Sequence, residues 1–168
     1  MRLIVRSSAI HAAGVFTLER IPKGTLVAEY TGTRMKHDDA DTLYNERPYT
    51  YLFGVGDGSH VVDGFSMAMY LNHSCEPNCE TEEDEDEHIW IRAIRDIEPG
   101  EELAYEYFLY DGEGAADCHC GAGRCRGTMY SPTELRKRKR AAGKKSAPAQ
   151  KKSKPAKKKG AGKKAARR

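Results

Sequence analysis

The chain has 168 residues, of which 39% are hydrophobic and 32% charged, enough for one domain with a sizeable core. No apolar run approaches the roughly 18 residues that a membrane span needs, and the N-terminus lacks the apolar region of a secretory signal, so we expect an intracellular protein rather than an integral membrane protein. The net charge of +3 hides a split, because residues 134–168 hold 17 Lys and Arg against one acid, whereas residues 1–133 hold 11 bases and 24 acids, a net of −13. This pattern indicates an acidic domain joined to a strongly basic tail.

Short β-rich runs separated by turns make up the first half of the chain. Strands are predicted at residues 3–6, 15–18, 25–30, 49–55 and 60–63. Gly and Pro mark the turns between them, at residues 12–14, 21–24 and 56–58. Residues 37–47 have helical spacing, with Leu43 and Tyr44 as the expected anchors. Pro48 ends this helix.

The β pattern continues in the second half of the chain. Residues 89–93 alternate between apolar and other side chains, which is the period of a half-buried strand. A turn at residues 99–100 precedes the last predicted strand, at residues 103–108, whereas the acidic residues 82–87 indicate a solvated loop. Regularly spaced short strands with one short helix predict a mostly β fold built from small sheets.

The C-terminal segment loses its apolar residues. Residues 131–140 are expected to form one helical turn or more, with Pro132 near its start. From about Ala141 the composition is reduced to Lys, Ala, Gly, Pro, Ser and a few other polar residues, which cannot bury enough surface to offset the entropy of ordering. We therefore expect disorder beyond that point.

Five cysteines point to a metal site rather than to disulfides, because an odd number cannot pair completely. Cys118, Cys120 and Cys125 supply three thiolates within eight residues, and a closed zinc site needs four ligands. The fourth ligand has to come from elsewhere, and the only other thiols are Cys75 and Cys79. Two alternatives stay open: His119 in place of a thiolate, or surface thiols with no metal.

Three segments together resemble the SET-domain family of protein lysine methyltransferases with a post-SET zinc loop. They read Asn-His-Ser-Cys-Glu-Pro-Asn-Cys at residues 72–79, Gly-Glu-Glu-Leu-Ala-Tyr-Glu-Tyr at residues 100–107, and Cys-His-Cys-Gly-Ala-Gly-Arg-Cys-Arg-Gly at residues 118–127. The resemblance covers roughly residues 1–130. It implies small β-sheets around a pseudoknot, with a SET domain at residues 1–110 and a zinc-bound post-SET loop at residues 111–130. Residues 131–168 make up the basic tail, whose composition predicts disorder.

The resemblance also implies two cofactors and a set of site residues. S-adenosylmethionine binds in one pocket while the substrate lysine enters from the opposite face through a narrow channel. By position, the cofactor contacts are Gly14, Val15, Phe16, Asn72, His73 and Tyr107. The catalytic positions are Tyr107, Tyr51 and Tyr105, and Tyr30 borders the site. The zinc ligands are Cys75, Cys118, Cys120 and Cys125, which would leave Cys79 as a spare thiol.

Two departures from the family pattern concern the cofactor end of the site. The family usually has a Gly-x-Gly turn near its N-terminus, whereas here the first glycine is Ala12, so that this turn has to avoid a positive φ at residue 12 or absorb strain. An Arg-Phe pair often precedes the Asn-His motif, and here Met69 and Tyr70 stand in its place, which removes a cationic contact.

Tyrosines suit methyl transfer for a physical reason. The nucleophile, the methyl carbon and the leaving sulfur have to be in line, so positioning dominates. Only a neutral amine attacks, yet free lysine has a pKa of about 10.4. A desolvated channel and a nearby sulfonium lower that pKa, and the hydroxyls of Tyr107 and Tyr51 can orient the amine. Two routes remain open for the proton that the lysine ammonium loses: transfer to a tyrosinate that acts as a base, and loss to water.

The two charged halves predict partners. An acidic domain attracts basic, lysine-bearing segments such as histone or histone-like tails, and the Lys-rich tail resembles those of linker histones, which bind nucleic acid through phosphates without reading bases. We therefore expect association with chromatin or a nucleoid. A solvated tail, a nuclear-import signal, an automethylation target and a pseudosubstrate stay open for the tail. The alternative for the whole chain is a catalytically weak, zinc-containing protein that acts through its tail.

Overall fold

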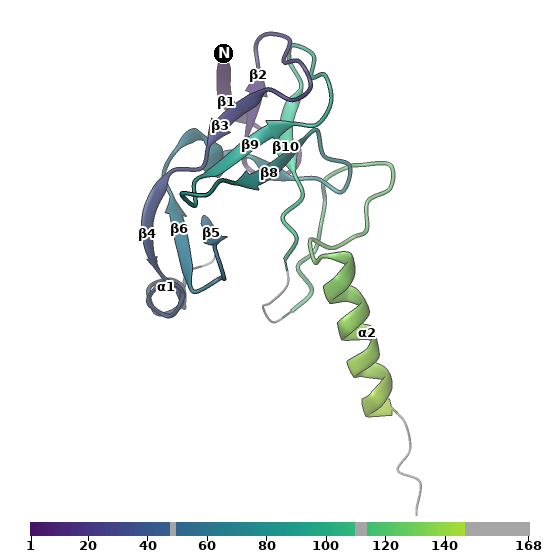
Figure 1. Cartoon of the computed structure of the whole chain (residues 1–168). Coiled ribbons are helices and arrows are strands. Elements are labelled where there is room, and N and C mark those ends of the chain that lie inside the picture. Colours follow the sequence, from purple (N-terminus) through teal and green to yellow (C-terminus); the bar gives the residue numbers. More distant parts are fainter. Residues whose placement is uncertain (48–49, 110–113, 147–168) are drawn as a thin grey trace, which may run out of the picture.

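Figure 1 shows the chain in a computed structural model, which describes residues 1–47, 50–109 and 114–146 and, in the last of these, side chains through Ala142. The described residues form short strands, two α-helices and one 3-10 helix. In chain order they are β1 (Leu3–Ser7), β2 (Ala13–Thr17), β3 (Leu26–Glu29), β4 (Gly32–Lys36), α1 (His37–Tyr44), β5 (Leu52–Val55), β6 (His60–Gly64), η1 (Met67–Tyr70), β7 (Asn72–His73), β8 (Cys79–Glu83), β9 (Ile89–Ala93), β10 (Glu102–Tyr105) and α2 (Pro132–Ser146).

Three small sheets make up the body, which confirms the mostly β prediction. One sheet has the order β1-β2-β10-β7, the second β3-β9-β8 and the third β4-β6-β5. Their neighbouring strands are antiparallel except for β7 and β10, which run parallel with Ala104 opposite Asn72 and Tyr105 opposite His73. This pairing brings the Asn-His and Tyr-x-Tyr motifs, about 30 residues apart in the chain, side by side.

The segment between β7 and β8 is held against β10 by Asn78. Its side chain donates to the Glu102 carbonyl over 2.8 Å and accepts the Ala104 N–H over 2.9 Å, while its own N–H donates to the Ala104 carbonyl over 3.2 Å. Asn78 is 5% exposed, so these bonds satisfy a buried amide. The threading of a pseudoknot through this region stays a prediction.

Buried aliphatic side chains from all three sheets meet in one core. Its fully buried members of large volume include Ile21, Leu71, Ile89, Ile91, Ile97 and Leu103. The alternation of residues 89–93 is confirmed, because Ile89, Ile91 and Ala93 are buried while Trp90 and Arg92 are partly exposed. The turns at Gly24, Gly58 and Gly100 are confirmed as well, each with a positive φ.

Helix α1 is shorter and packs differently than the sequence predicts. It ends at Tyr44, and its buried residue is Ala40, whereas the predicted anchor Leu43 is 49% exposed. Tyr44 is anchored by a hydrogen bond to Asp63 of β6 rather than by apolar burial, because its hydroxyl donates to that carboxylate over 2.6 Å. The predicted stop at Pro48 and the start of the strand at Tyr49 lie outside the described residues.

Three strands differ from the strand predictions. Strand β4 was not expected because its sequence is polar, and β8 includes Glu82 and Glu83, which we had assigned to a loop. Both strands pair along their whole length with a neighbour that supplies the hydrogen bonds. Strand β10 ends at Tyr105 rather than at Phe108, because the N–H of Tyr107 donates to the ring of His73 instead of to a strand.

Helix α2 extends beyond the one or two turns expected at residues 131–140. It runs through Ser146, past Ala141, because Ala, Lys and Arg are good helix formers. The predicted disorder at residues 147–168 lies outside the described residues. Among the helices that the structure describes, none is long and apolar enough to cross a membrane.

Candidate active site and metal centre

An aromatic groove of about 1200 Å³ opens between the β4-β6-β5 sheet and the segment that follows β10. Tyr30, Tyr51, Tyr105 and Tyr107 all line it, together with Phe53. The structure thus brings together four tyrosines that are predicted to form or border the site and that come from three separate stretches of the chain. The groove also has a methionine and a leucine on its rim, Met129 and Leu109, from the C-terminal segment.

Tyr105 and Tyr107 form the inner wall of this groove. Their ring centroids lie 4.9 Å apart, and Phe53 lies 6.3 Å from Tyr105. The Tyr107 hydroxyl donates to the Leu71 carbonyl over 2.9 Å, which orients the phenol without a charged partner. The phenol is therefore held by the backbone just before the Asn-His motif.

Burial keeps these phenols protonated. It raises the pKa of Tyr107 to about 12 and the pKa of Tyr105 well above its usual value of 10.0. It also raises the pKa of Tyr30, whose hydroxyl donates to the Tyr51 carbonyl over 2.6 Å. At neutral pH the tyrosine wall of the groove is therefore uncharged, although Asp41, Asp57 and Glu106 also line the groove. Against that wall an amine loses water, which favours its uncharged form.

Tyr51 lies at the mouth of the groove. Its side chain is 38% exposed and its ring lies 6.3 Å from the ring of Tyr70. The phenol of Tyr51 faces solvent, whereas its backbone is held inside the fold. The Tyr51 carbonyl accepts hydrogen bonds from the Tyr30 hydroxyl and from the Gly64 N–H. The sequence analysis grouped Tyr51 with Tyr107, and the structure separates a rim position from an inner position.

The Asn-His end of the site is organised by a carboxylate that the sequence analysis missed. Glu102 accepts hydrogen bonds from the Ser8 hydroxyl and from the Asn72 amide, each over 2.8 Å. The same Asn72 amide donates to the Ala13 carbonyl over 2.8 Å. Ser8, β2, β7 and β10 are therefore tied together at one point, and the two donors of Asn72 are used within the chain.

Glycine at position 14 is required by packing rather than by backbone conformation. A Cβ atom there would collide with the Glu102 carboxylate and crowd the Asn72 amide, while Gly14 itself has no positive φ. Of the two outcomes that the sequence leaves open for the preceding turn, the structure has the strained one, since Ala12 adopts a φ of +29°. Val15 and Phe16 follow with buried side chains, which leaves their backbone as the part that borders the turn.

His73 lies between the tyrosines and the cysteines. Its Nδ1 accepts the Tyr107 N–H over 3.2 Å, and its Nε2 lies 3.4 Å from the Cys75 sulfur. Burial lowers the pKa of His73, so the ring is neutral, with Nδ1 as an acceptor and the proton on Nε2. Both ring nitrogens are used within the chain, so a cofactor contact at this residue would be made by its backbone.

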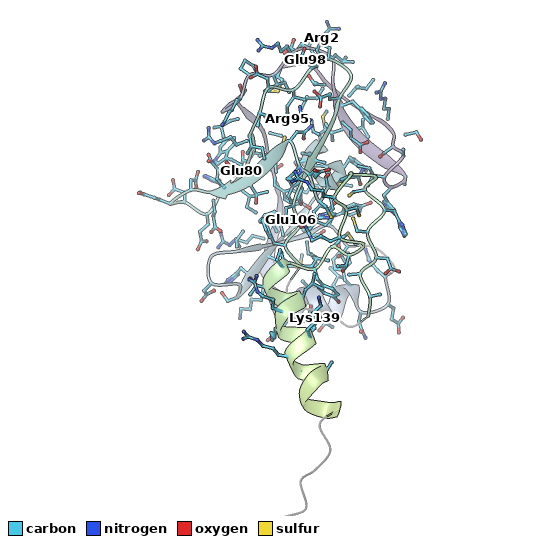
Figure 2. The ribbon with its side chains drawn as sticks, turned by 90° about the vertical axis from the view of Figure 1, so that its right-hand side faces the viewer. Arg2, Glu80, Arg95, Glu98, Glu106 and Lys139 are labelled. Carbon is cyan, nitrogen blue, oxygen red and sulfur yellow. The ribbon has the colours of Figure 1, made fainter. Side chains whose placement is uncertain are left out.

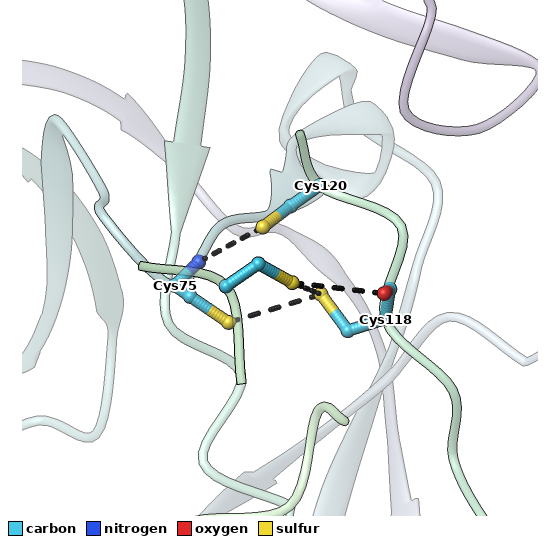
Figure 3. Close-up of side chains that lie close together, drawn as sticks. Cys75, Cys118 and Cys120 are labelled. Carbon is cyan, nitrogen blue, oxygen red and sulfur yellow. Dashed lines mark hydrogen bonds between the residues drawn. The ribbon is translucent and has the colours of Figure 1, made fainter. Parts of the chain in front are cut away.

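Four cysteine sulfurs gather in one cluster (Figure 3), and all lie within 4.8 Å of one another. The cluster lies on the Nε2 side of His73. The Cys118 sulfur lies 3.8 Å from that of Cys75 and 3.7 Å from that of Cys125. A tetrahedral zinc with bonds of about 2.3 Å requires sulfurs about 3.8 Å apart, so the donor set fits zinc. The fourth ligand predicted from the resemblance is thus in position, whereas Cys79 is buried in the apolar core.

Backbone amides support ionised thiols in this cluster. The N–H groups of Cys75, Arg126 and Gly127 each donate to a cysteine sulfur over 3.4 Å. Burial alone would raise the pKa of Cys120, but hydrogen bonds from the Cys75 and Ala122 backbone and from neighbouring thiols lower it to about 6. Burial raises the pKa of Cys118 to about 12, so this thiol needs a cation to lose its proton near neutral pH.

A partly buried ion pair joins the cysteine loop to the segment after β10. Arg126 donates to Glu106, whose side chain is 10% exposed, and the other carboxylate oxygen lies 3.3 Å from Nδ1 of His73. The Arg126 Nε atom has no hydrogen-bond partner within the described part of the chain. The guanidinium therefore lies between a carboxylate and the thiol cluster. Sequence reasoning missed this pair, although both residues stand inside quoted motifs.

Comparisons with known proteins agree with this geometry. The model of the SET domain matches residues 12–108, more than half of the chain. The Arabidopsis thaliana histone-lysine N-methyltransferase ATX2 is 37% identical over 82% of this chain and 14% of its own length. The Chaetomium globosum histone-lysine N-methyltransferase, H3 lysine-4 specific, is 34% identical over 73% of this chain and 12% of its own length. The human histone-lysine N-methyltransferase 2D is 36% identical over 73% of this chain and 2% of its own length, so the chain spans a small fraction of each relative.

Proposed function

Because this chain belongs to the SET-domain family, we propose that it is a protein-lysine N-methyltransferase that uses S-adenosylmethionine as methyl donor. The observation that carries the proposal is the pairing of β7 with β10, which sets the Tyr105–Tyr107 wall directly beside Asn72 and His73. An uncharged tyrosine wall next to a turn that could hold a cofactor is the arrangement that this reaction needs.

In this proposal the inner tyrosines prepare the amine. A lysine side chain that enters the groove loses water against Tyr105, Phe53 and Tyr30, which favours its neutral form. The Tyr107 oxygen, held by the Leu71 carbonyl, accepts from the amine and aims its lone pair. Because burial raises the pKa of Tyr107 to about 12, we assign it an orienting role rather than that of a tyrosinate base.

We assign the cofactor to the Asn72 end of the site, where it would supply an electrophilic methyl group on a sulfonium. The residues that would hold it are Gly14, Val15 and Phe16 through their backbone, with Asn72 and His73 below them. Glu102 acts there as a positioning residue, because it fixes both Ser8 and Asn72. The tight fit at Gly14 supports this assignment, since any side chain there would displace the carboxylate.

Zinc has a structural role in this proposal. Four sulfurs with tetrahedral spacing form a closed site with no position left for a substrate, which is typical of structural zinc. Cys75 belongs to the segment after β7 and the other three ligands to residues 118–125, so the metal would fasten this loop to the Asn-His motif. We keep the division into a SET domain at residues 1–110, a post-SET loop at residues 111–130 and a basic tail at residues 131–168.

We propose a histone or a histone-like basic protein as the substrate. The names of the relatives support histone lysine as the target class, and the net charge of −13 on residues 1–133 would attract such a segment. We also propose that the tail binds nucleic acid and that the protein is associated with chromatin or a nucleoid. The exposed cations of α2 support the tail proposal.

The test is methyl transfer by the purified full chain from labelled S-adenosylmethionine to core histones and to a bacterial histone-like protein, read by mass spectrometry of every protein present. We expect a methylated lysine on a basic protein, and the same spectra report automethylation. Label on no protein, with intact binding of duplex DNA, would overturn the enzymatic proposal and leave the catalytically weak, tail-acting alternative.

A further inference from the structure

Helix α2 is joined rigidly to the rim of the aromatic groove. Its N-cap is Ser131, whose hydroxyl accepts the Glu134 N–H over 3.1 Å and whose own N–H donates to the Leu109 carbonyl over 2.8 Å. Tyr130, 4% exposed, pairs with Leu109 in a short parallel bridge. Leu109 and Met129 line the groove, so the helix begins where the groove ends.

One face of α2 fastens the helix to this base. Glu134 is 7% exposed and accepts from Arg138 over 2.9 Å, and the Arg138 guanidinium lies over the Tyr130 ring at 3.7 Å. Glu134, the one acid among the described side chains of this helix, and Arg138 thus serve to anchor the helix. A cation–π contact and a partly buried ion pair at one site hold the first two turns in a fixed direction.

The opposite face of the helix presents cations to solvent. At 3.6 residues per turn, Arg140 lies about 40° from Arg136 around the helix axis and Lys139 about 60° on its other side, whereas Glu134 lies about 160° away. Arg136, Lys139 and Arg140 are all exposed. No carboxylate pairs with these three within the described residues, and Lys137 shares Glu134 with Arg138.

The charged parts of the molecule are separated in space. Figure 1 shows α2 projecting away from the sheets, and Figure 2 shows Lys139 on this helix, with Glu106 above its near end and Arg2 at the far end of the body. Because residues 1–133 carry a net charge of −13, a polyanion is repelled by the body and attracted to α2. Its approach is therefore confined to the end of the molecule that has the groove rim.

We propose that the exposed cationic face of α2, formed by Arg136, Lys139 and Arg140, docks duplex nucleic acid through its phosphates and so holds a nucleic-acid-bound protein substrate at the mouth of the groove. This inference rests on the proposed function for its second half. The face has no aromatic residue, so it reads charge and not bases. A flexible tail could only raise local concentration, whereas a helix fixed to Leu109 and Tyr130 also sets where the substrate lies.

The experiment compares two charge reversals in the full chain. One variant is Arg136→Glu/Lys139→Glu/Arg140→Glu, and the matched control reverses three cations of the distal tail, Lys157→Glu/Lys158→Glu/Lys159→Glu. Binding of a mixed-sequence DNA duplex is measured by fluorescence anisotropy from 50 to 200 mM salt, with helical content checked by circular dichroism. Methyl transfer is measured on the same histones, free and assembled on DNA.

We expect the α2 variant to bind the duplex on the order of tenfold or more weakly, with a salt slope reduced by about 3, because three phosphate contacts are lost. We also expect it to lose the rate advantage of the DNA-assembled histone while its rate on free histone does not fall. The distal-tail control should keep that advantage even if its affinity falls.

Three results would overturn the inference. The first is an α2 variant with wild-type affinity and salt slope. The second is loss of the DNA-dependent rate advantage in the distal-tail control as well as in the α2 variant. The third is equal binding of polyglutamate and DNA at matched charge, which would assign the face to acidic proteins. If no histone is methylated by the wild type, the proposed function fails, and the binding measurements still decide the docking face.

Discussion

The tyrosine groove and the cysteine cluster lie on opposite sides of His73, and burial acts on both in the same direction. It raises the pKa of Tyr107 and of Cys118 to about 12 in each case. The consequences are opposite. A phenol that stays protonated remains useful as an uncharged hydrogen-bonding group, whereas a thiol has to ionise before it binds a metal.

This difference shows why the groove can form from the chain alone whereas the cysteine cluster cannot. In the groove, backbone carbonyls of Leu71 and Tyr51 satisfy the buried hydroxyls of Tyr107 and Tyr30. In the cluster, backbone N–H groups reach the sulfurs, but only a cation stabilises four thiolates together. We therefore expect the groove to persist without metal and the cysteine loop to depend on it.

The largest effect is expected for Cys120→Ser, which tests whether the cysteine loop depends on a bound metal. Loss of one of four thiolates from a closed site should abolish stoichiometric zinc binding and lower methyl transfer about 100-fold, because the loop loses its attachment at Cys75. Zinc per chain is measured by mass spectrometry of the metal. Cys79→Ala is the matched control, because Cys79 is a core thiol and this variant should keep one zinc. Full activity of metal-free Cys120→Ser would contradict the structural role of the metal.

Tyr107→Phe changes the tyrosine groove and leaves the cysteine cluster intact. Turnover should fall about 100-fold, since the hydroxyl that we propose to orient the amine is gone, and zinc content should stay at one per chain. Steady-state kinetics and metal analysis read the two effects separately. Tyr70→Phe, a partly buried tyrosine on η1, is the control. Equal rates for Tyr107→Phe and wild type would remove Tyr107 from the mechanism.

Alkaline pH tests the raised pKa of Tyr107 itself. An unfolded tyrosine ionises near 10.0 but the folded Tyr107 near 12, so the folded state is favoured equally at all pH values below 10 and loses about 2 kcal/mol between pH 10 and 12. Chemical denaturation at several pH values should show a smaller alkaline loss for Tyr107→Phe. Identical curves for both proteins would mean that the phenol titrates normally in the folded state.

Glu102 gives a finer test at the Asn72 end of the site, to which we assign the cofactor. Glu102→Ala removes the shared acceptor of Ser8 and Asn72, and the affinity for S-adenosylmethionine should fall about tenfold, measured by calorimetry. Glu102→Gln keeps one carbonyl acceptor and should recover most of the affinity. Zinc content should not change in either variant. A loss of zinc would instead connect Glu102 with the cluster.

The smallest expected effect is at the strained turn. Ala12→Gly removes the cost of a φ of +29°, and the folded state should gain about 0.5 kcal/mol after the entropy of the extra glycine is offset. Ala13→Gly, within β2, should destabilise the protein by a similar amount. Thermal unfolding of both variants gives the comparison, and the same sign for both would contradict the strain at residue 12.

Local sequence pattern was sufficient to predict an element wherever the residues of that element alone favour its conformation. The period of residues 89–93 and the glycine turns at residues 56–58 needed no partner to be predicted. The same is true of the motifs at residues 72–79 and 118–127, which contain the four cysteines of the cluster. Strands β4 and β8 were beyond such reasoning, because their polar sequences become strands only through hydrogen bonds from β6 and β9.

Residue identities were sufficient to predict the family, the acidic and basic halves, the thiols of the cysteine cluster and the tyrosines that meet in the groove. Tertiary structure alone decided that Tyr51 lies on the rim and Tyr107 inside, that Glu102 holds the Asn72 end together, and that Arg126 stands between a carboxylate and the cysteines. The physical reason is that residue identity states which chemistry is available, whereas burial, charge neighbours and hydrogen-bond partners depend on chain segments that are distant in sequence.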